Sequence, residues 1–243
     1  MRVGREPVVR AALTLLDQLG LDGLTLRAIA AELGVRAPTL YWRFRNKQDL
    51  VDEMASQVLA DYSATLLRGL ERSPQATWPA WTRHSAQSFR VELLRYRDGA
   101  RMVAGTHLKD TSVYAVMETA LGVFAAAGIA PHEAAVCLKT AHDYVIGFTI
   151  EQQAVISPSG ERDARYSLEA REARMDPARY PLARSIGVTL FASYDAVFER
   201  GLEFVIAGFA QILPRRSKAW RDFRSYWKSS HAGQAGPAGP ERG

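Results

Sequence analysis

The chain has 243 residues, of which 47% are hydrophobic and 23% are charged. This length suffices for one large domain or two smaller ones, and the composition excludes a chain that is disordered throughout. No apolar run approaches the roughly 18 residues of a membrane span, and the N-terminus lacks the long apolar segment of a secretory signal. The single cysteine, Cys137, excludes an intrachain disulfide and indicates the reducing cytoplasm.

The net charge of +5 is unevenly distributed along the chain. Residues 1–50 hold eight Lys and Arg against five Asp and Glu, residues 51–213 hold sixteen against nineteen, and residues 214–243 hold seven against two. A cationic N-terminal module on a slightly acidic body is the charge distribution expected of a protein that binds phosphate groups.

Nearly every segment shows the apolar period of a helix, and no segment alternates as a strand does. The first helix is expected over 6–19, where Gly20 ends it, and two short helices follow within 24–47. Asn46, with Asp49 three residues later, predicts the start of a long helix. After a break at 73–81, further helices are expected at about 79–97, 112–127, 132–154 and 187–213. We expect a loop or short helix over 156–185, disorder at the low-complexity end of the chain, and an all-α fold.

Residues 24–47, LTLRAIAAELGVRAPTLYWRFRNK, have the layout of a helix-turn-helix. Gly34 stands where the first helix needs a left-handed residue, and Pro38 suits the first turn of the second helix. Leu40 and Phe44 share an inward side. The other faces carry aromatic, hydroxyl and cationic side chains: Thr39, Tyr41, Trp42 and Arg43. A purely structural helical hairpin is the alternative, but such side chains suit phosphates and base edges, so the pattern predicts recognition of double-stranded DNA.

Residues 5–62 resemble the DNA-binding module of the TetR family, above all in LTLRAIAAELGV and PTLYWRFRNKQDLVD. SFRVELLRYRDGARMVAGT at 88–106 and GFTIEQQAV at 147–155 resemble the ligand-binding domain of the tetracycline repressors. The resemblance implies an all-helical homodimeric repressor that binds a palindromic operator and responds to a small molecule. It divides the chain into a DNA-binding domain at 1–48, a ligand-binding and dimerisation domain at 49–213, and a basic tail at 214–243.

The resemblance also implies roles at the DNA. Arg27 matches an arginine that contacts guanine, and Pro38 matches an apolar base contact. Thr39 and Tyr41 match residues that contact phosphate or a thymine methyl group, and Lys47 matches a phosphate clamp at a helix N-terminus. Trp42 is counted with the DNA-binding residues of this segment, although we expect it to pack in the module and not to read bases. The chain departs from the tetracycline repressors at three positions, where they carry Thr, Gln and His, so the operator is expected to differ: Leu26, Ala37 and Arg43.

In the ligand-binding domain, Phe89 and Glu151 match residues that contact the drug in tetracycline repressors. Ser85 replaces their drug-binding asparagine, Ser63 replaces a ligand-contacting histidine, and Val103 replaces the histidine that binds drug-chelated magnesium. Valine cannot coordinate a metal, so we expect an aromatic or polycyclic effector other than magnesium–tetracycline, and neither a metal site nor a cofactor. The expected pocket is mostly apolar and is lined by Phe89, Leu93, Val103, His107, Val116, Tyr144, Phe148 and Glu151.

Several alternatives remain open. The helices at about 132–154 and 188–213 are expected to form a dimer interface, where Gly147, Gly201 and Gly208 allow close approach, but they could be core helices of a monomer. Each pocket residue could serve ordinary packing, and the chain could be an effector-independent or architectural DNA-binding protein. A well-formed empty pocket would favour a protein that senses a small molecule. A filled core would favour a DNA-binding protein that needs no effector. Cys137 and His142 lie five residues apart on a helix and point in different directions, and no catalytic motif is present, so we expect no enzyme.

Overall fold

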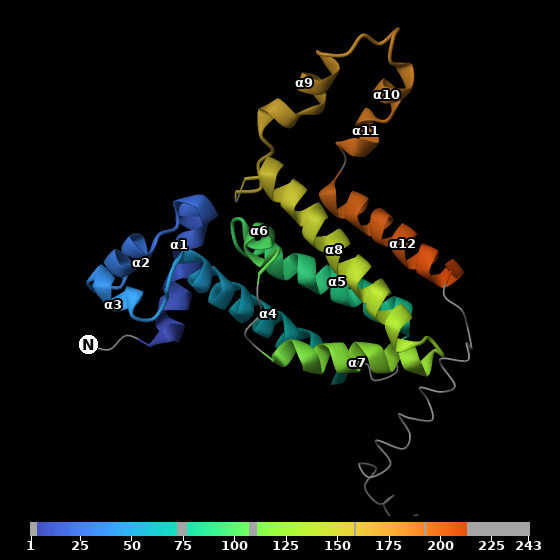
Figure 1. Ribbon diagram of the computed structural model, residues 1–243. Helices are drawn as coiled ribbons and strands as arrows, with labels where there is room; N and C mark the ends of the chain where they lie inside the picture. The colour runs from blue at the N-terminus through green and yellow to red at the C-terminus, as the bar shows by residue number, and fades with distance from the viewer. Residues whose placement is uncertain (1–3, 72–76, 107–110, 158, 192, 213–243) are drawn as a thin grey trace, which may run out of the picture.

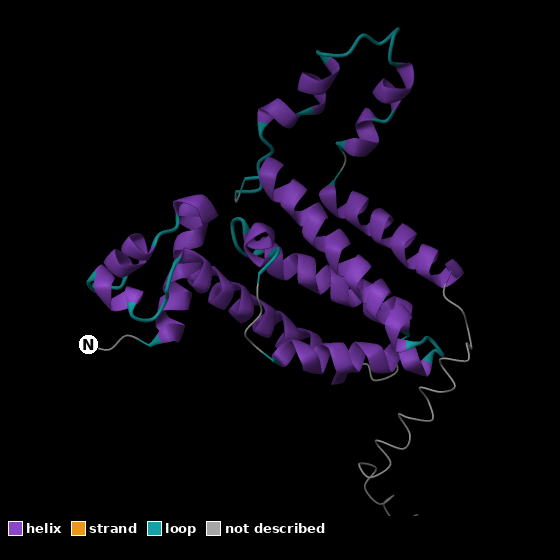
Figure 2. Cartoon of the chain, in the orientation of Figure 1, coloured by secondary structure: helices purple, strands orange, loops and turns teal. Residues whose placement is uncertain are grey.

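The computed structural model describes residues 4–71, 77–106, 111–157, 159–191 and 193–212. Within these ranges the secondary structure is helical, and the one pair of bridged extended residues is Ile156 with Arg162. Figure 2 shows this all-helical architecture, which confirms the predicted fold class. The tail at 214–243 and the predicted pocket residue His107 lie outside the described residues.

A small N-terminal head consists of α1 (Arg5–Gly23), α2 (Leu26–Glu32) and α3 (Ala37–Tyr41). Figure 1 shows it beside the body of the molecule, joined to it by the long helix α4 (Lys47–Glu71). The head and the first turns of α4 share a core of fully buried apolar side chains: Val8, Ala12, Leu16, Leu24, Ile29, Leu40, Phe44 and Met54. Because α4 belongs to both parts, the head can turn only if this helix or its contacts shift.

Local signals in the sequence account for the shape of the head. Thr25 caps α2 by accepting a hydrogen bond from the backbone N–H of Ala28. Gly34 turns the chain between α2 and α3 with a φ of +63°, a conformation that favours glycine. The Asn46 side chain accepts from the N–H of Asp49 at 2.8 Å and so caps α4, as predicted. Gly20 kinks α1 at φ +69°, and one further turn runs to Gly23, beyond the predicted end of the helix.

The body contains α5 (Trp78–Leu94), α6 (Gly99–Val103), α7 (Ser112–Ala126), α8 (Pro131–Val155) and α12 (Tyr194–Ile212). Helix α8 packs against α5, α6, α7 and α12, and α4 packs against α7 and α5. The predicted helix at 79–97 ends at Leu94, because a turn with Asp98 at φ +58° leads into the short α6. Among the described residues, no helix is long and apolar enough to cross a membrane.

An arm of short helices projects from the body between the ends of α8 and α12 (Figure 1). It holds a 3₁₀ turn at Ala164–Tyr166, α9 (Leu168–Glu172), α10 (Pro181–Ser185) and α11 (Gly187–Leu190). The single helix predicted at 187–213 is therefore wrong, because the helical backbone ends at Leu190 and α12 begins only at Tyr194. Exposed apolar side chains gather on the arm: Leu182, Ile186, Val188 and Leu190.

Candidate DNA-binding surface and effector site

The outer surface of the head presents most of the side chains expected to contact DNA, but Leu26, one of the three positions expected to set the operator apart, is buried in the core. Leu40 and Phe44 are fully buried and anchor α3, which turns Pro38 and Tyr41 outward. Arg27, in the first turn of α2, is exposed as well. The remaining predicted contacts on this segment are half-buried: Ala37, Thr39 and Arg43. The structure thus brings α2 and α3 together into one surface of aromatic, hydroxyl and cationic groups.

Trp42 is 91% exposed, so the prediction that it packs inside the head is wrong. Its position directly follows Tyr41, at the end of α3, where the buried side of the short helix is already taken by Leu40 and Phe44. The neighbouring Tyr41 is 52% exposed, so two adjacent aromatic side chains are open to solvent at the end of α3. This exposure places Trp42 among the candidate contact residues of the head.

The ammonium of Lys47 points back toward α1, where it donates hydrogen bonds to the carbonyls of Leu21 and Asp22. It therefore caps the C-terminal end of α1 as well as standing at the start of α4. Two exposed arginines flanking α3, Arg36 and Arg45, were missed by the sequence reasoning. The available signal was their position on either side of PTLYW, within reach of the same surface.

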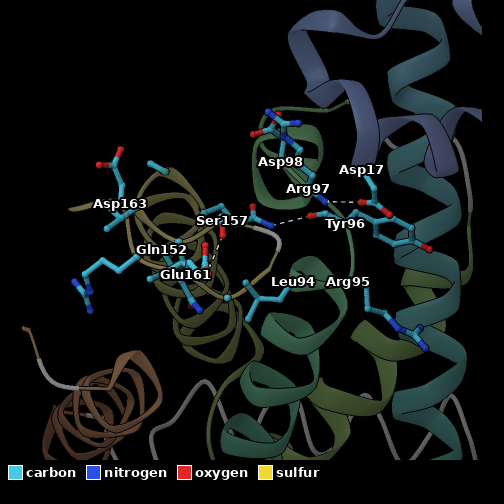
Figure 3. Close-up of a pocket in the computed structure, with 16 residues that line it drawn as sticks. Asp17, Leu94, Arg95, Tyr96, Arg97, Asp98, Gln152, Ser157, Glu161 and Asp163 are labelled. Carbon is cyan, nitrogen blue, oxygen red and sulfur yellow. Dashed lines mark hydrogen bonds between the residues drawn. The ribbon is translucent and has the colours of Figure 1, made fainter. Parts of the chain in front are cut away.

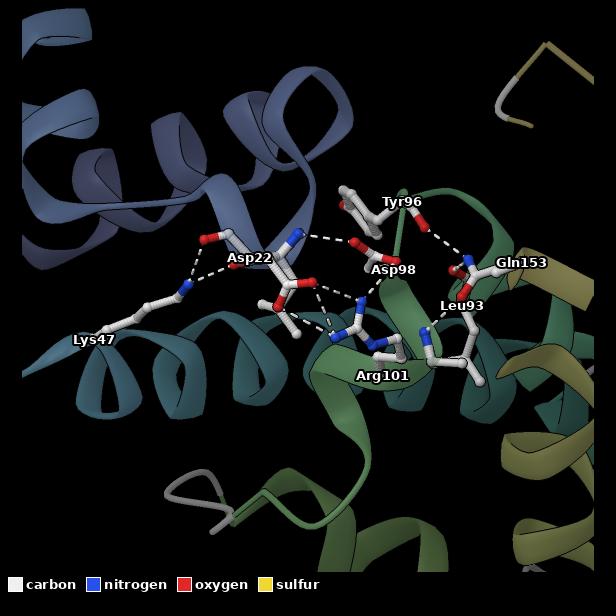
Figure 4. Close-up of polar contacts among 9 residues, drawn as sticks. Asp22, Lys47, Leu93, Tyr96, Asp98, Arg101 and Gln153 are labelled. Atoms are coloured by element: carbon white, nitrogen blue, oxygen red, sulfur yellow. Dashed lines mark hydrogen bonds and ion pairs between the residues drawn. The ribbon is translucent and has the colours of Figure 1, made fainter. Parts of the chain in front are cut away.

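The turn before α6 joins the body to the head through a set of polar contacts, shown in Figure 4. The Asp98 carboxylate accepts a hydrogen bond from the N–H of Leu21 at 2.8 Å. Arg101 pairs with Asp22 at 3.2 Å and with Asp98 at 3.4 Å. The backbone N–H of Arg97 donates to a carboxylate of α1, Asp17, at 2.8 Å. The end of α1 is thus held directly by the α5–α6 turn.

The same turn is held from the other side by Gln153 near the end of α8 (Figure 4). Its amide donates to the carbonyls of Tyr96 and Leu93 at 2.8 and 3.2 Å, and its oxygen accepts from the N–H of Ala100 at 3.1 Å. A displacement of α8 at this position must therefore either carry along the turn that holds α1 or break these hydrogen bonds.

Phe89, Leu93 and Val103, three of the predicted pocket residues, are buried in the main core cluster. The Phe89 ring stacks on the His142 imidazole, with ring centroids 4.9 Å apart and planes 22° apart. Another predicted residue, Ser85, shares a 2.7 Å hydrogen bond with the hydroxyl of Tyr62, and burial raises the pKa of Tyr62 to about 12. A cavity of about 40 Å³ lies between Tyr62, Ser85, Phe89 and His142, whereas Leu93 and Val103 are not among the residues that line it.

The other predicted pocket residues lie elsewhere. The Tyr144 hydroxyl donates a hydrogen bond to the carbonyl of Phe198 at 2.9 Å. The ring centroids of Phe148 and Phe198 are 5.2 Å apart. Tyr144 and Phe148 therefore pack between α8 and α12. Val116 packs against a second core cluster around Trp81 and Phe124. Ser63 is buried on α4, and Glu151 is exposed on α8. The nine predicted residues that the structure describes therefore do not form one lining.

A larger groove of about 820 Å³ lies where head and body meet, and no sequence signal indicated it. Figure 3 shows Asp17, Arg97 and Asp98 on one side of it, and Gln152, Glu161 and Asp163 on the other. Many of its side chains are already engaged. Arg97 donates to the carbonyl of Gln18. Arg162 lies over the rings of Phe191 and Tyr194, and Asp163 pairs with Arg165.

Comparison with known proteins agrees with this architecture. Residues 8–54 match the profile of bacterial regulatory proteins of the tetR family, and residues 71–213 match the tetracyclin repressor-like C-terminal domain. The chain belongs to the TetR family. Its head is accordingly a helix-turn-helix DNA-binding domain, followed by a helical C-terminal domain. The relatives described below include repressor proteins and a possible transcriptional regulator.

Individual relatives match most of this TetR-family chain. It is 38% identical over 209 residues to the tetracycline repressor protein class A from transposon 1721 of Escherichia coli, covering 84% of this chain and 89% of that protein. It is 36% identical to the class D repressor of Escherichia coli, covering 86% and 89%. The structure of a possible TetR family regulator from Streptomyces coelicolor A3(2) superposes with a TM-score of 0.75 at 30% identity, covering 86% and 100%. A class A TetR bound to 5a,6-anhydrotetracycline and magnesium gives 0.59 at 31% identity, covering 84% and 96%.

Proposed function

We propose that this chain is a homodimeric transcriptional repressor that binds a palindromic operator and is released from it by a small molecule. In this proposal residues 1–48 bind DNA, residues 49–213 bind the effector and the second subunit, and 214–243 form a basic tail. Two-fold symmetry predicts half-sites about one helical turn apart, roughly 34–36 Å or a little more. The observation that carries the proposal is the exposed surface of α2 and α3, with Arg27, Tyr41 and Trp42 open to solvent.

Exposed apolar residues on α8 and α12 support the dimer. Phe204 on α12 is 62% exposed and Val136 on α8 is 63% exposed, although both helices bury their opposite sides. Gly147 and Gly208 have open space where a side chain would stand, as expected on helix faces that a second subunit approaches closely. Covering these faces would remove apolar surface from water.

An effector other than magnesium–tetracycline is supported by the chemistry of the site. Val103, at the position where tetracycline repressors carry the magnesium-binding histidine, is buried and offers no lone pair. The cavity beside Phe89 and His142 instead offers an aromatic face and hydroxyl groups, which suits an aromatic or polycyclic molecule. The contacts of Gln153 and Asp98 provide a path from α8 to α1, so an effector that prefers one position of α8 must change the affinity for DNA.

A second candidate is a DNA-binding regulator that needs no effector. The small volume of the cavity, about 40 Å³, favours this reading, because the core beside Phe89 is nearly filled in this state. A screen of aromatic compounds against the protein bound to its operator separates the two candidates. Dissociation by at least one compound supports the sensor, and uniform resistance supports the effector-independent regulator.

The test of operator recognition starts with selection of duplexes from a randomised library by the purified protein. Arg27→Ala is expected to weaken binding to the selected duplex by about 1–3 kcal/mol in a gel-shift titration, because a bidentate contact to guanine would be lost. Arg68→Ala removes the same charge from an exposed position at the far end of α4 and serves as the matched control. Equal affinities of the two variants, or no preference for any duplex, would refute the proposed role of the head.

A further inference from the structure

The hydroxyl of Thr149 on α8 is fully buried and has no hydrogen-bond partner among the described residues. Other threonines in helices donate to the carbonyl four residues before them: Thr140 to Val136 and Thr82 to Trp78, each at 2.8 Å. A buried hydroxyl without a partner destabilises a protein, because it has given up its hydrogen bonds to water. Such a group therefore calls for a specific explanation.

The surroundings of Thr149 distinguish it from the other unpartnered buried side-chain atoms of the described residues. Trp81 Nε1 lies in the second core cluster and Arg171 Nη1 lies in the arm. Thr149 instead lies on the inner face of α8 in the row of residues spaced by four: Ala141, Val145, Thr149 and Gln153. One turn before it, Val145 lines the cavity beside Phe89, and one turn after it, Gln153 holds the α6 turn.

We propose that Thr149 is a polar anchor of the effector site, which takes a planar, uncharged aromatic molecule bearing hydroxyl or keto oxygens. The inference rests on the repressor function proposed above and names the ligand chemistry of its effector site. One ring lies against Phe89, an oxygen at one end meets the Tyr62–Ser85 hydroxyl pair, and an oxygen at the other end meets the Thr149 hydroxyl.

The lining of the cavity supports this ligand class. One flat ring already stacks on Phe89: the His142 imidazole lies against it with the two ring planes 22° apart. The cavity lining contains no Asp, Glu, Lys or Arg among the described residues, so a charged ligand would be buried without a counter-charge. The paired hydroxyls of Tyr62 and Ser85 can each donate or accept a hydrogen bond.

Entry of a ring requires the cavity to enlarge. Its volume of about 40 Å³ has room for ordered water but not for an aromatic ring. His142 is the part of the wall that can yield, because its side chain is 46% exposed although its ring stacks on Phe89. A ring that takes the place of the imidazole on Phe89 then extends along the inner face of α8 toward Thr149.

The test compares the full-length wild type with Thr149→Val and Thr149→Ser. Valine has nearly the shape of threonine without the hydroxyl, so Thr149→Val is expected to raise the melting temperature of the ligand-free protein by about 2–4 °C. Thr82→Val is the matched control. It also replaces a buried helical threonine, but its hydroxyl is bonded, so its melting temperature should fall.

The ligand arm of the test uses 1,8-dihydroxyanthraquinone as the probe in titration calorimetry. Thr149→Val is expected to bind it about tenfold more weakly than the wild type, and Thr149→Ser, which keeps the hydroxyl, within about threefold.

Three results would overturn the assignment. A lower melting temperature of Thr149→Val would mean that a trapped water or another group already satisfies the hydroxyl. Unchanged affinity of Thr149→Val would mean that the hydroxyl does not meet the ligand, and absence of binding to the wild type would reject the ligand class. None of these results depends on DNA. Failure of the wild type to prefer any duplex would therefore reject the repressor function separately.

Discussion

Replacement of Gly201 by alanine tests the packing of α12 against α8. A Cβ atom at Gly201 would lie 2.2 Å from the Tyr144 hydroxyl oxygen and 3.0 Å from the ring carbon that bears it. The ring must retreat by roughly 1 Å to restore an ordinary C–H···O separation of about 3.3–3.6 Å. It cannot do so freely, because its hydroxyl bonds to the Phe198 carbonyl and its face stacks on the Phe198 ring at 5.4 Å.

The expected loss follows from these contacts. Overpacking costs about 1–3 kcal/mol and the broken hydrogen bond about 0.5–1.5 kcal/mol, offset by the roughly 0.5–1 kcal/mol that alanine gains over glycine in a helix. Gly201→Ala should therefore destabilise the protein by about 1–3 kcal/mol, which lowers the melting temperature by about 5 °C for a chain of this size.

Thermal unfolding at one fixed protein concentration measures this loss. Gly122→Ala in α7 is the control, because nothing lies within 4 Å of its added Cβ, and it should stabilise the protein slightly. The double variant Tyr144→Phe, Gly201→Ala removes the closest contact and should recover part of the loss. If Gly201→Ala were as stable as Gly122→Ala, or if the double variant gained nothing, the steric reasoning would be refuted.

Three further predictions concern the α5–α6 turn, the core and the dimer. Asp98→Ala should lower the free energy of unfolding by about 1–3 kcal/mol, because it removes the acceptor of the Leu21 N–H and because alanine is disfavoured at the left-handed φ of this position. Asp98→Asn should be tolerated, and equal losses for the two variants in thermal unfolding would contradict this reasoning. Burial raises the pKa of the Cys137 thiol to about 11 from its ordinary 9.0, so the unfolded chain releases that proton first. Stability should fall as the pH rises from 9 to 11, and Cys137→Ala should flatten this slope in denaturant titrations; an unchanged slope would exclude the thiol as its source. Phe204→Glu should give a helical monomer in sedimentation velocity, because it places a charge on an exposed apolar face of α12; a persistent dimer would exclude this face from the interface.

The head could be predicted from the sequence because its determinants are local. Leu40 and Phe44 lie four residues apart on one side, and Gly34 occupies the left-handed position that the turn requires. The role of Lys47 could not be predicted in this way. Its ammonium bonds to Leu21 and Asp22, and that contact depends on how α1 and α4 meet, which no local pattern encodes.

The effector region was less predictable because its residues depend on distant partners. Tyr144 and Phe148 have the composition of a pocket wall, but α12 covers them, since Gly201 lets the Tyr144 ring approach that helix closely. The short α6 was also missed. It exists because Gly99 fits where a Cβ would lie 2.2 Å from the Leu93 carbonyl, a contact between the end of α5 and the start of α6.

The arrangement of polar contacts explains how a small change in the body can reach the head. Gln153 uses its one side-chain amide to hold three backbone groups of the α5–α6 turn, at Leu93, Tyr96 and Ala100. These bonds are directional, so a shift of α8 by a fraction of their length either carries the turn along or breaks them. Because Asp98 in that turn holds the N–H of Leu21, the end of α1 follows the turn. A ligand that moves α8 one helical turn before Gln153 would therefore also move the end of α1 through these two sets of hydrogen bonds.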